Sequence, residues 1–409
     1  MFLFSFTFTA VYYYIAFIMS IVSAILVYKI SNFRKQWYLF VISVVLLALS
    51  MAVYQVTLCM FLAFIVLLSI KSTLLNEKEA WRSFITRNIR YALCCILGLA
   101  MYLLSNNLAL NIANTKLTDY QGMSSMFDLS VPLIKERILL AYKEFFLPSI
   151  NRSYCYYFDV QTVICHTLIV FTLLFLVASY TIKAFKNNNP SKGFQLILLF
   201  AIFPLSTNSV FLTADPFKTR IHRLMTFSSI ILFICLIFMI DILLKSETNT
   251  NRFILSLKKA AKNCATVLLL FILLHFSYYA NVYYRNISIQ QNETISYFNR
   301  LISRIENIEN YDKNLKVAYI NEYEKFTYIS PNSLNNNIEN IEEFGKVKLV
   351  NDYAWREYMS VWCGYKPDVL TDEEIEKISD KPEVKAMACY PDDGSIKIID
   401  NTIVVKFSD

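Results

Sequence analysis

The sequence predicts a polytopic α-helical membrane protein that ends in a small soluble α+β domain. Of its 409 residues 56% are hydrophobic and 17% are charged, so lipid must be the solvent for much of the chain. Several stretches approach the roughly 20 apolar residues that cross a hydrocarbon core. We therefore expect a transmembrane domain over 1–284 and a soluble domain over 285–409, where the composition turns polar.

Eight segments qualify as membrane-spanning helices. The second, third and fourth are short, at about 14 to 17 residues, and can cross only near the lower length limit or when tilted into a protein-lined cavity. The predicted spans are 5–28, 38–52, 54–70, 91–104, 160–182, 194–213, 224–244 and 263–281.

Basic residues indicate how these spans are oriented. Sixteen of them fall in four short loops, which the positive-inside rule places in the cytoplasm. These loops are 29–35, 71–90, 183–192 and 245–262. Residues 37–70 then begin and end inside, so they must form a hairpin that turns near 52–55.

The same rule places both ends of the chain on the external side. The tail 285–409 holds 22 acidic and 15 basic residues, whereas the membrane part is basic. The net charge of +7 therefore reflects the basic residues of the cytoplasmic loops, and it gives no support for nucleic-acid binding. Met1 has neither a basic flank nor a signal-peptide cleavage site after it. An eight-span chain that starts outside in this way looks like one that lacks its first span.

External loops and the tail contain further predicted elements. In the loop 105–159 the segment 130–147 reads as an amphipathic helix lying flat at the membrane surface, with Ile134, Ile138 and Phe145 on one face. In the tail we expect helices and strands, with a hairpin at its end. The predicted helices are 288–309 and 372–378, and the strands are 316–320, 346–350, 395–399 and 402–406.

Motifs of soluble enzymes are absent from the sequence. It has no phosphate-binding glycine loop, no zinc-ligand spacing and no Ser-His-Asp signature, so we expect neither a cofactor nor a metal. His166 and His275 fall in spans without a ligand cluster and are interpreted as packing residues. Asp241, at the cytoplasmic end of a span, is expected to meet water.

Three potential cations stand where a late span meets the external surface. Arg220, His222 and Arg223 are able to clamp a phosphate, because a guanidinium presents a planar fork suited to bidentate recognition. Anchoring of the span to lipid headgroups explains the same residues equally well. At the hairpin tip, Tyr54 and Gln55 either line a cavity or belong to an interfacial belt of tyrosines.

A general base for glycosyl transfer would be an external carboxylate. For each candidate carboxylate, the alternative is that it is simply solvated by water. The candidates are Asp119, Glu136 and Asp215, within a wider set that adds Asp128, Glu144 and Asp159.

Nine cysteines divide between membrane and exterior. Six lie in or at the end of spans, where a thiol behaves as a small apolar group. Of the external ones, Cys155, Cys363 and Cys389, we predict a disulfide between Cys363 and Cys389, both in the compact tail, with free thiols as the alternative.

Three pieces of sequence together resemble a known family. They are Val53-Tyr54-Gln55-Val56-Thr57, Thr219-Arg220-Ile221-His222-Arg223-Leu224-Met225, and Met387-Ala388-Cys389-Tyr390-Pro391 with the following Asp393-Gly394-Ser395-Ile396-Lys397 and Val404-Val405-Lys406. The sequence is similar to the glucosyl transferase II family, the serotype-converting O-antigen glucosyltransferases of phages and bacteria. The resemblance runs over most of the chain.

This resemblance implies a GT-C-like enzyme of the bacterial inner membrane with its C-terminal domain in the periplasm. Such enzymes take glucose from undecaprenyl phosphate and attach it to a sugar of the O-antigen of lipopolysaccharide. Arg220, His222 and Arg223 would then hold the donor phosphate, and helix 130–147 would shape the acceptor groove.

The sequence departs from the family pattern at its start. Members usually begin with an extra span and an external acidic loop thought to be needed for catalysis, and neither precedes Met1. The interpretations are an N-terminally truncated inactive form, a misassigned start, or a variant that uses an acid within 105–159. The alternatives to this family are an O-antigen polymerase or acetyltransferase, and a polysaccharide transporter or flippase.

Overall fold

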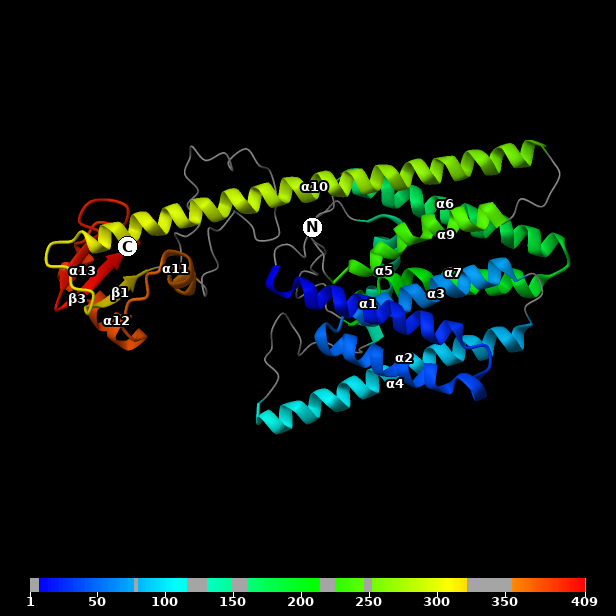
Figure 1. Cartoon of the computed structure of the whole chain (residues 1–409), viewed down its shortest axis with the longest axis horizontal. Helices are drawn as coiled ribbons and strands as arrows, with labels where there is room; N and C mark the ends of the chain where they lie inside the picture. Colours follow the sequence, from blue (N-terminus) through cyan, green and yellow to red (C-terminus); the bar gives the residue numbers. More distant parts are fainter. Residues whose placement is uncertain are drawn as a thin grey trace. The chain divides into compact units, whose positions relative to one another are not determined.

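A computed structural model of the chain describes residues 7–76, 80–115, 131–148, 160–213, 225–245, 252–321 and 355–408. The chain divides into two compact units, Met1–Ser277 and Tyr278–Asp409. The first unit is helical, and the second combines helices with a small sheet (Figure 1).

Helices account for the regular structure of the first unit. Apolar sequence forms helices in lipid because each backbone N–H and C=O must then be bonded within its own segment. The elements are α1 (Thr7–Lys29), α2 (Phe33–Val53), α3 (Thr57–Leu75), α4 (Trp81–Ala113), α5 (Val131–Phe146), α6 (Val160–Lys186), α7 (Pro190–Thr207), α8 (Val210–Thr213), the 3-10 turn η3 (Phe227–Ile230), α9 (Ile231–Lys245) and the first part of α10 (Arg252–Glu306).

Five helices within the described residues are long and apolar enough to cross a membrane. They confirm that the chain has the character of a membrane protein, while the predicted number of eight spans stays a prediction. The five are Val11–Lys29, Phe33–Val53, Thr57–Leu75, Trp81–Ala113 and Val163–Lys186, and two shorter apolar helices cover Ile231–Ile242 and Lys262–Tyr278.

The helices at the three short predicted spans are longer than the spans themselves. Helices α2, α3 and α4 have 21, 19 and 33 residues. Helix α4 begins ten residues before the expected start and takes in polar residues such as Arg87 and Asn106. Likewise, the last predicted span and the polar helix after it are one helix, α10. Hydropathy identifies the residues that can lie in lipid. The backbone hydrogen bonds of a helix can continue into neighbouring polar residues, so a helix can be longer than its apolar segment.

Helix α3 lies at the centre of the first unit. It contacts α1, α2, α4, α7 and α9, and Figure 1 shows it alongside α1 and α7. In its most apolar window 67% of the residues are buried inside the protein, against 11% in the corresponding window of α4. Helix α4 therefore keeps most of its surface for lipid.

Small residues let α1, α2 and α4 approach closely. The Ser23 and Ser43 hydroxyls each donate to the other's backbone carbonyl at 2.8 Å, and Ser43 Oγ also lies 3.1 Å from Cys94 Sγ. One turn further along α4, a Cβ on Gly98 would come within 2.9 Å of Leu47 Cδ2. Such contacts are typical of helix pairs in membranes, where packing and hydrogen bonds replace the hydrophobic effect.

Charged side chains hold the C-terminal end of α3. Lys192 Nζ donates to Leu74 O at 3.0 Å and to Asn76 O at 3.1 Å, which satisfies carbonyls that a helix end leaves open. Lys71 Nζ lies 2.8 Å from Asp241 Oδ2 of α9. Asp241 was expected to meet only water; instead it forms an interhelical ion pair, because α9 packs against α3 at this end.

The second unit contains a three-stranded sheet. Strand β3 (Thr402–Lys406) lies in the middle, parallel to β1 (Lys316–Ile320) and antiparallel to β2 (Ile396–Ile399). The hairpin predicted at the end of the chain is confirmed, and Asp400 and Asn401 have φ of 48° and 57°. Two positive φ values are typical of a type I′ turn. The strand predicted at 346–350 lies outside the described residues.

Helices cover both faces of this sheet. On one face Tyr319 and Val405 join the end of α10 and α11 (Trp355–Cys363) in a cluster centred on Trp355. On the other face Ala318 and Val404 pack with α12 (Asp372–Ser379) and α13 (Pro382–Lys385). Burial on both sides explains why β1 and β3 are continuous apolar runs without alternation.

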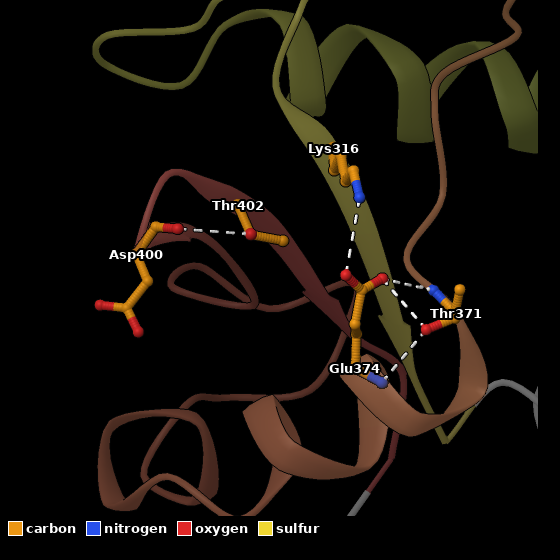
Figure 2. Close-up of polar contacts among 5 residues, drawn as sticks. All are labelled: Lys316, Thr371, Glu374, Asp400 and Thr402. Carbon is orange, nitrogen blue, oxygen red and sulfur yellow. Dashed lines mark hydrogen bonds and ion pairs between the residues drawn. The ribbon is translucent and has the colours of Figure 1, made fainter.

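A capping box begins α12 and ties it to β1 (Figure 2). The Glu374 carboxylate accepts hydrogen bonds from Thr371 N at 2.9 Å and Thr371 Oγ1 at 3.1 Å, and its other oxygen lies 3.6 Å from Lys316 Nζ. The hydrogen bonds from the Thr371 backbone and hydroxyl lower the pKa of Glu374. The helix start is thus joined to the edge of the sheet through one carboxylate.

We expect Trp355→Ala to destabilise the second unit by about 3–5 kcal/mol, because the ring is 1% exposed and packs 4.7 Å from the Tyr319 ring. The control is Trp362→Ala, on the same helix but 55% exposed, which should cost less than about 1 kcal/mol. Pulse proteolysis of the full-length protein in urea measures both free energies. Equal losses would contradict the assigned core.

For the Lys71–Asp241 pair we expect Lys71→Met and Asp241→Asn each to cost about 1–2 kcal/mol, since both side chains are partly exposed, at 22% and 32%. The exchanged variant, Lys71→Asp with Asp241→Lys, should recover most of the loss. Thermal unfolding in detergent tests this, with the exposed Lys183→Met as control. No recovery on exchange would argue that the two charges act separately.

Candidate functional site

The hairpin tip between α2 and α3 is closed by short hydrogen bonds. Tyr54 N donates to Ser50 O at 3.0 Å and so ends α2, while Thr57 Oγ1 donates to Tyr54 O at 2.8 Å. The turn predicted near 52–55 is confirmed by these helix ends. Serine and threonine thus close the turn by bonding to backbone groups that the helix ends leave open.

Tyr54 and Gln55 both engage neighbouring helices. The Tyr54 ring lies 5.0 Å from the Tyr13 ring and 6.3 Å from the Phe17 ring of α1. Gln55 Nε2 lies 2.7 Å from Tyr102 OH on α4. These two side chains hold the tip against α1 and α4, and their role in lining a cavity stays a prediction.

Helix α5 is the helix that the amphipathic pattern predicts at 130–147. Its inner face is more polar than the pattern suggests: alongside Leu140 and Phe145 it buries Arg137, which is fully inaccessible, and Glu144, which is 6% exposed. Glu136, the predicted candidate base on this helix, is exposed. Glu144 was predicted only as an external carboxylate; it is buried because it lies seven residues after Arg137, on the same face of α5.

Side chains from other elements bind the backbone of α5. Asn208 Nδ2 donates to Ala141 O at 2.9 Å, and His166 Nε2 donates to Phe145 O at 2.7 Å. In the other direction Arg137 Nη1 donates to Leu212 O at 3.2 Å. His166 is thus a packing residue with a structural hydrogen bond. Helix α5 packs with this inner face against α6, α7 and α8.

The break between α7 and α8 places Asn208 and Leu212 for these contacts. Pro204 lies inside α7 and cannot donate a backbone hydrogen bond, and the helix ends three residues later at Thr207. Ser228 Oγ donates to Thr207 O, which satisfies one of the last carbonyls of α7. The chain then resumes as the single turn α8.

A small apolar cluster joins the hairpin tip, α5 and α8. We call it the α5–α8 cluster. Its buried members are Cys59, Leu140, Ala141, Val210 and Phe211, with Val56, Leu205 and Met225 packed against them. It therefore brings together the start of α3 and both described flanks of residues 214–224. Lys71 and Lys192 lie at the opposite end of α3.

The predicted cations lie within residues 214–224. Arg220, His222 and Arg223 fall outside the described residues, as do the candidate bases Asp119 and Asp215. Among the residues that the structure describes, no group of three or more His, Cys, Asp or Glu side chains is arranged to hold a metal. Among the described residues, the buried charged side chains of α5 are Arg137 and Glu144.

The disulfide predicted between Cys363 and Cys389 is not formed. No sulfur–sulfur bond joins these two described residues, and both are half-buried. Cys363 ends α11 against the Trp355 cluster, whereas Cys389 lies in the turn where its carbonyl accepts from Asp392 N. Membership of one compact domain is therefore not accompanied by a bond between these two sulfurs.

Comparison with known proteins gives one result for the membrane part. Residues 1–230, more than half of the chain, match the family described as Glucosyl transferase GtrII. No curated protein and no solved structure matches the chain. The matched region takes in the hairpin tip, α5, α8 and the basic segment that follows α8. The chain therefore belongs to the GtrII glucosyl transferase family.

Proposed function

We propose that this protein transfers glucose from undecaprenyl phosphate to a sugar of the O-antigen, on the periplasmic face of a bacterial inner membrane. Membership of the glucosyl transferase family carries the proposal. A donor linked to a membrane lipid suits a chain with apolar helices, and it needs no phosphate-binding glycine loop.

The proposed chemistry is a displacement at the anomeric carbon of glucose. A carboxylate takes the proton from the acceptor hydroxyl, the acceptor oxygen forms a bond to the anomeric carbon, and the bond from that carbon to the phosphate oxygen breaks. The lipid phosphate leaves as an anion, so cations held beside it stabilise the transition state. This step needs no redox cofactor.

We assign the cations to Arg220, His222 and Arg223. The α5–α8 cluster supports this, because it fixes Phe211 and Met225, which flank the interval that holds these residues. For the base we favour Asp119 or Asp215. Glu136 is exposed on α5, and a general base has to reach its substrate in a site that excludes water.

If the arginines hold the donor phosphate, Arg220→Ala and Arg223→Ala should each weaken donor use by about 1.5–3 kcal/mol, the size of a hydrogen bond to a charged group. Substitution of either arginine by lysine should restore donor use only partly, because lysine keeps the positive charge but lacks the planar group that donates two parallel hydrogen bonds. The assay is glucose transfer from polyprenyl-phosphate glucose by membranes containing equal amounts of each variant. Full rescue by lysine would support headgroup anchoring instead.

For the orientation, we expect alkaline phosphatase fused after Arg285 to be active, because four basic loops are assigned to the cytoplasm. The matched control is the same fusion after Asn189, between α6 and α7, which should be inactive. An inactive fusion at Arg285 together with an active one at Asn189 would reverse the topology.

A further inference from the structure

The outer face of α11 presents an aromatic patch to solvent. We call it the α11 patch, and it consists of Tyr358, Val361 and Trp362, which lie three or four residues apart and therefore on one side of the helix. The opposite side buries Trp355 and Met359. Val361 is 73% exposed and Trp362 is 55% exposed, whereas Tyr358 is half-buried. Single exposed apolar side chains are common, but neighbouring ones that form a patch mark an interaction site.

A series of stacked rings joins the α11 patch to the core of the second unit. The buried Phe298 ring of α10 is stacked on Trp355 at 6.2 Å and lies 5.9 Å from the Tyr358 ring. The Tyr358 ring is stacked in turn on Trp362, at 6.1 Å and 30°, and its hydroxyl donates to Gln291 O at 3.4 Å. Trp362 thus rests on a ring that is itself fixed. Little conformational entropy is lost when a ligand stacks on the rest of the indole.

An exposed and supported indole is suited to a sugar ring. The C–H groups on one face of a pyranose carry partial positive charge, and the face of an aromatic ring is negative, so the two surfaces attract each other when they stack. The indole N–H at the edge of Trp362 adds a donor for a sugar hydroxyl. The chain belongs to a glucosyl transferase family, and such an enzyme has to bind a glycan as its acceptor.

Charge disfavours a membrane surface as the ligand of the α11 patch. Helices that lie on a bilayer carry lysine and arginine on their polar face, where these residues meet anionic headgroups. On α11 the exposed charged residue is Glu357, one turn before Val361. The guanidinium of Arg356 lies over the Trp355 ring, at 5.4 Å. A neutral sugar is not repelled by the carboxylate beside the patch.

Size disfavours a folded protein as the ligand. A specific protein interface buries roughly 800 Å² on each partner. Even a whole aromatic side chain buries only about 150–250 Å², and the α11 patch has three partly exposed side chains on a helix of nine residues. The patch therefore matches one or two sugar rings better than a protein surface.

We propose that the α11 patch is a binding subsite for the acceptor glycan. Trp362 stacks on a sugar ring, Tyr358 supports the indole, and Val361 extends the apolar surface. The inference rests on the proposed function for the acceptor being the O-antigen. A sugar that is bound here takes no part in the chemical step, so its contacts are equally strong in the ground state and the transition state. Loss of the subsite should then raise KM for the acceptor and leave kcat unchanged.

The test uses the full-length protein in nanodiscs, with O-antigen polysaccharide released from the lipopolysaccharide of the host bacterium as the probe. Trp362→Ala removes the indole, and Trp362→Phe keeps an aromatic face. The control is Trp37→Ala, because Trp37 on α2 is 58% exposed and lies in the first unit. Calorimetry measures polysaccharide binding, and glucose transfer from polyprenyl-phosphate glucose gives KM and kcat for the acceptor.

We expect Trp362→Ala to weaken polysaccharide binding about fivefold or more and to raise KM by a similar factor, with kcat within about twofold of the wild type. Trp362→Phe should retain binding within about threefold, because it keeps a ring that can stack. Trp37→Ala should bind like the wild type. Pulse proteolysis checks that each variant is folded.

Several results would overturn the inference. Normal binding and KM in Trp362→Ala would do so and would leave the proposed function standing, and no binding of the polysaccharide by the wild type would also overturn it. Stronger quenching of the wild type than of Trp362→Phe by brominated phosphatidylcholine in the nanodisc would assign the patch to the membrane instead. A wild type that binds the polysaccharide through Trp362 but transfers no glucose would contradict the proposed function and leave the subsite standing.

Discussion

The membrane part depends on one constraint: backbone and side-chain polar groups that leave water must find partners inside the protein. Within α1, α2 and α3 the buried hydroxyls meet it by bonding to carbonyls of neighbouring helices, as Ser20 does with Thr57 O at 2.8 Å. Helix α3 can be central because its own side chains are almost all apolar and its few hydroxyls are bonded. The need for partners is greater at helix ends, where backbone groups lack partners within the helix.

Each helix end near α5 is held by a side chain from another element. The backbone carbonyl of Phe145 accepts a hydrogen bond from His166, that of Thr207 from Ser228, and that of Leu212 from Arg137. These are long-range contacts, so the ends of α5, α7 and α8 are fixed together and not one by one.

In the second unit, the described residues form a sheet of three strands, which depends on packing against both of its faces. Two clusters, one on each face, bury nearly all the side chains of β1 and β3. The type I′ turn at Asp400 and Asn401 matches the twist of its strands, and the capping box at Thr371 supplies a helix start that eight residues would not stabilise alone. At the described strands and at the start of α12, local sequence rules and packing agree, which is typical of a domain that specifies one fold.

Local pattern was enough to predict the membrane character, the turn after Val53, helix α5 and the three described strands of the tail. These features follow from periodicity, turn residues and apolar length, all of which are read within a few neighbouring positions. The family was also recognisable from short motifs, and the match over residues 1–230 agrees with it.

Tertiary structure decided the rest. It extended α4 and α10 beyond their apolar runs, paired Asp241 with Lys71, turned Arg137 and Glu144 inward, and left Cys363 and Cys389 without a bond to each other. Partners such as Arg137 and Leu212 are 75 residues apart, so their contact depends on how α5 packs against α8. Sequence determines which segments leave water, because that is a property of each segment. Which buried charge meets which carbonyl is a property of the packed helices.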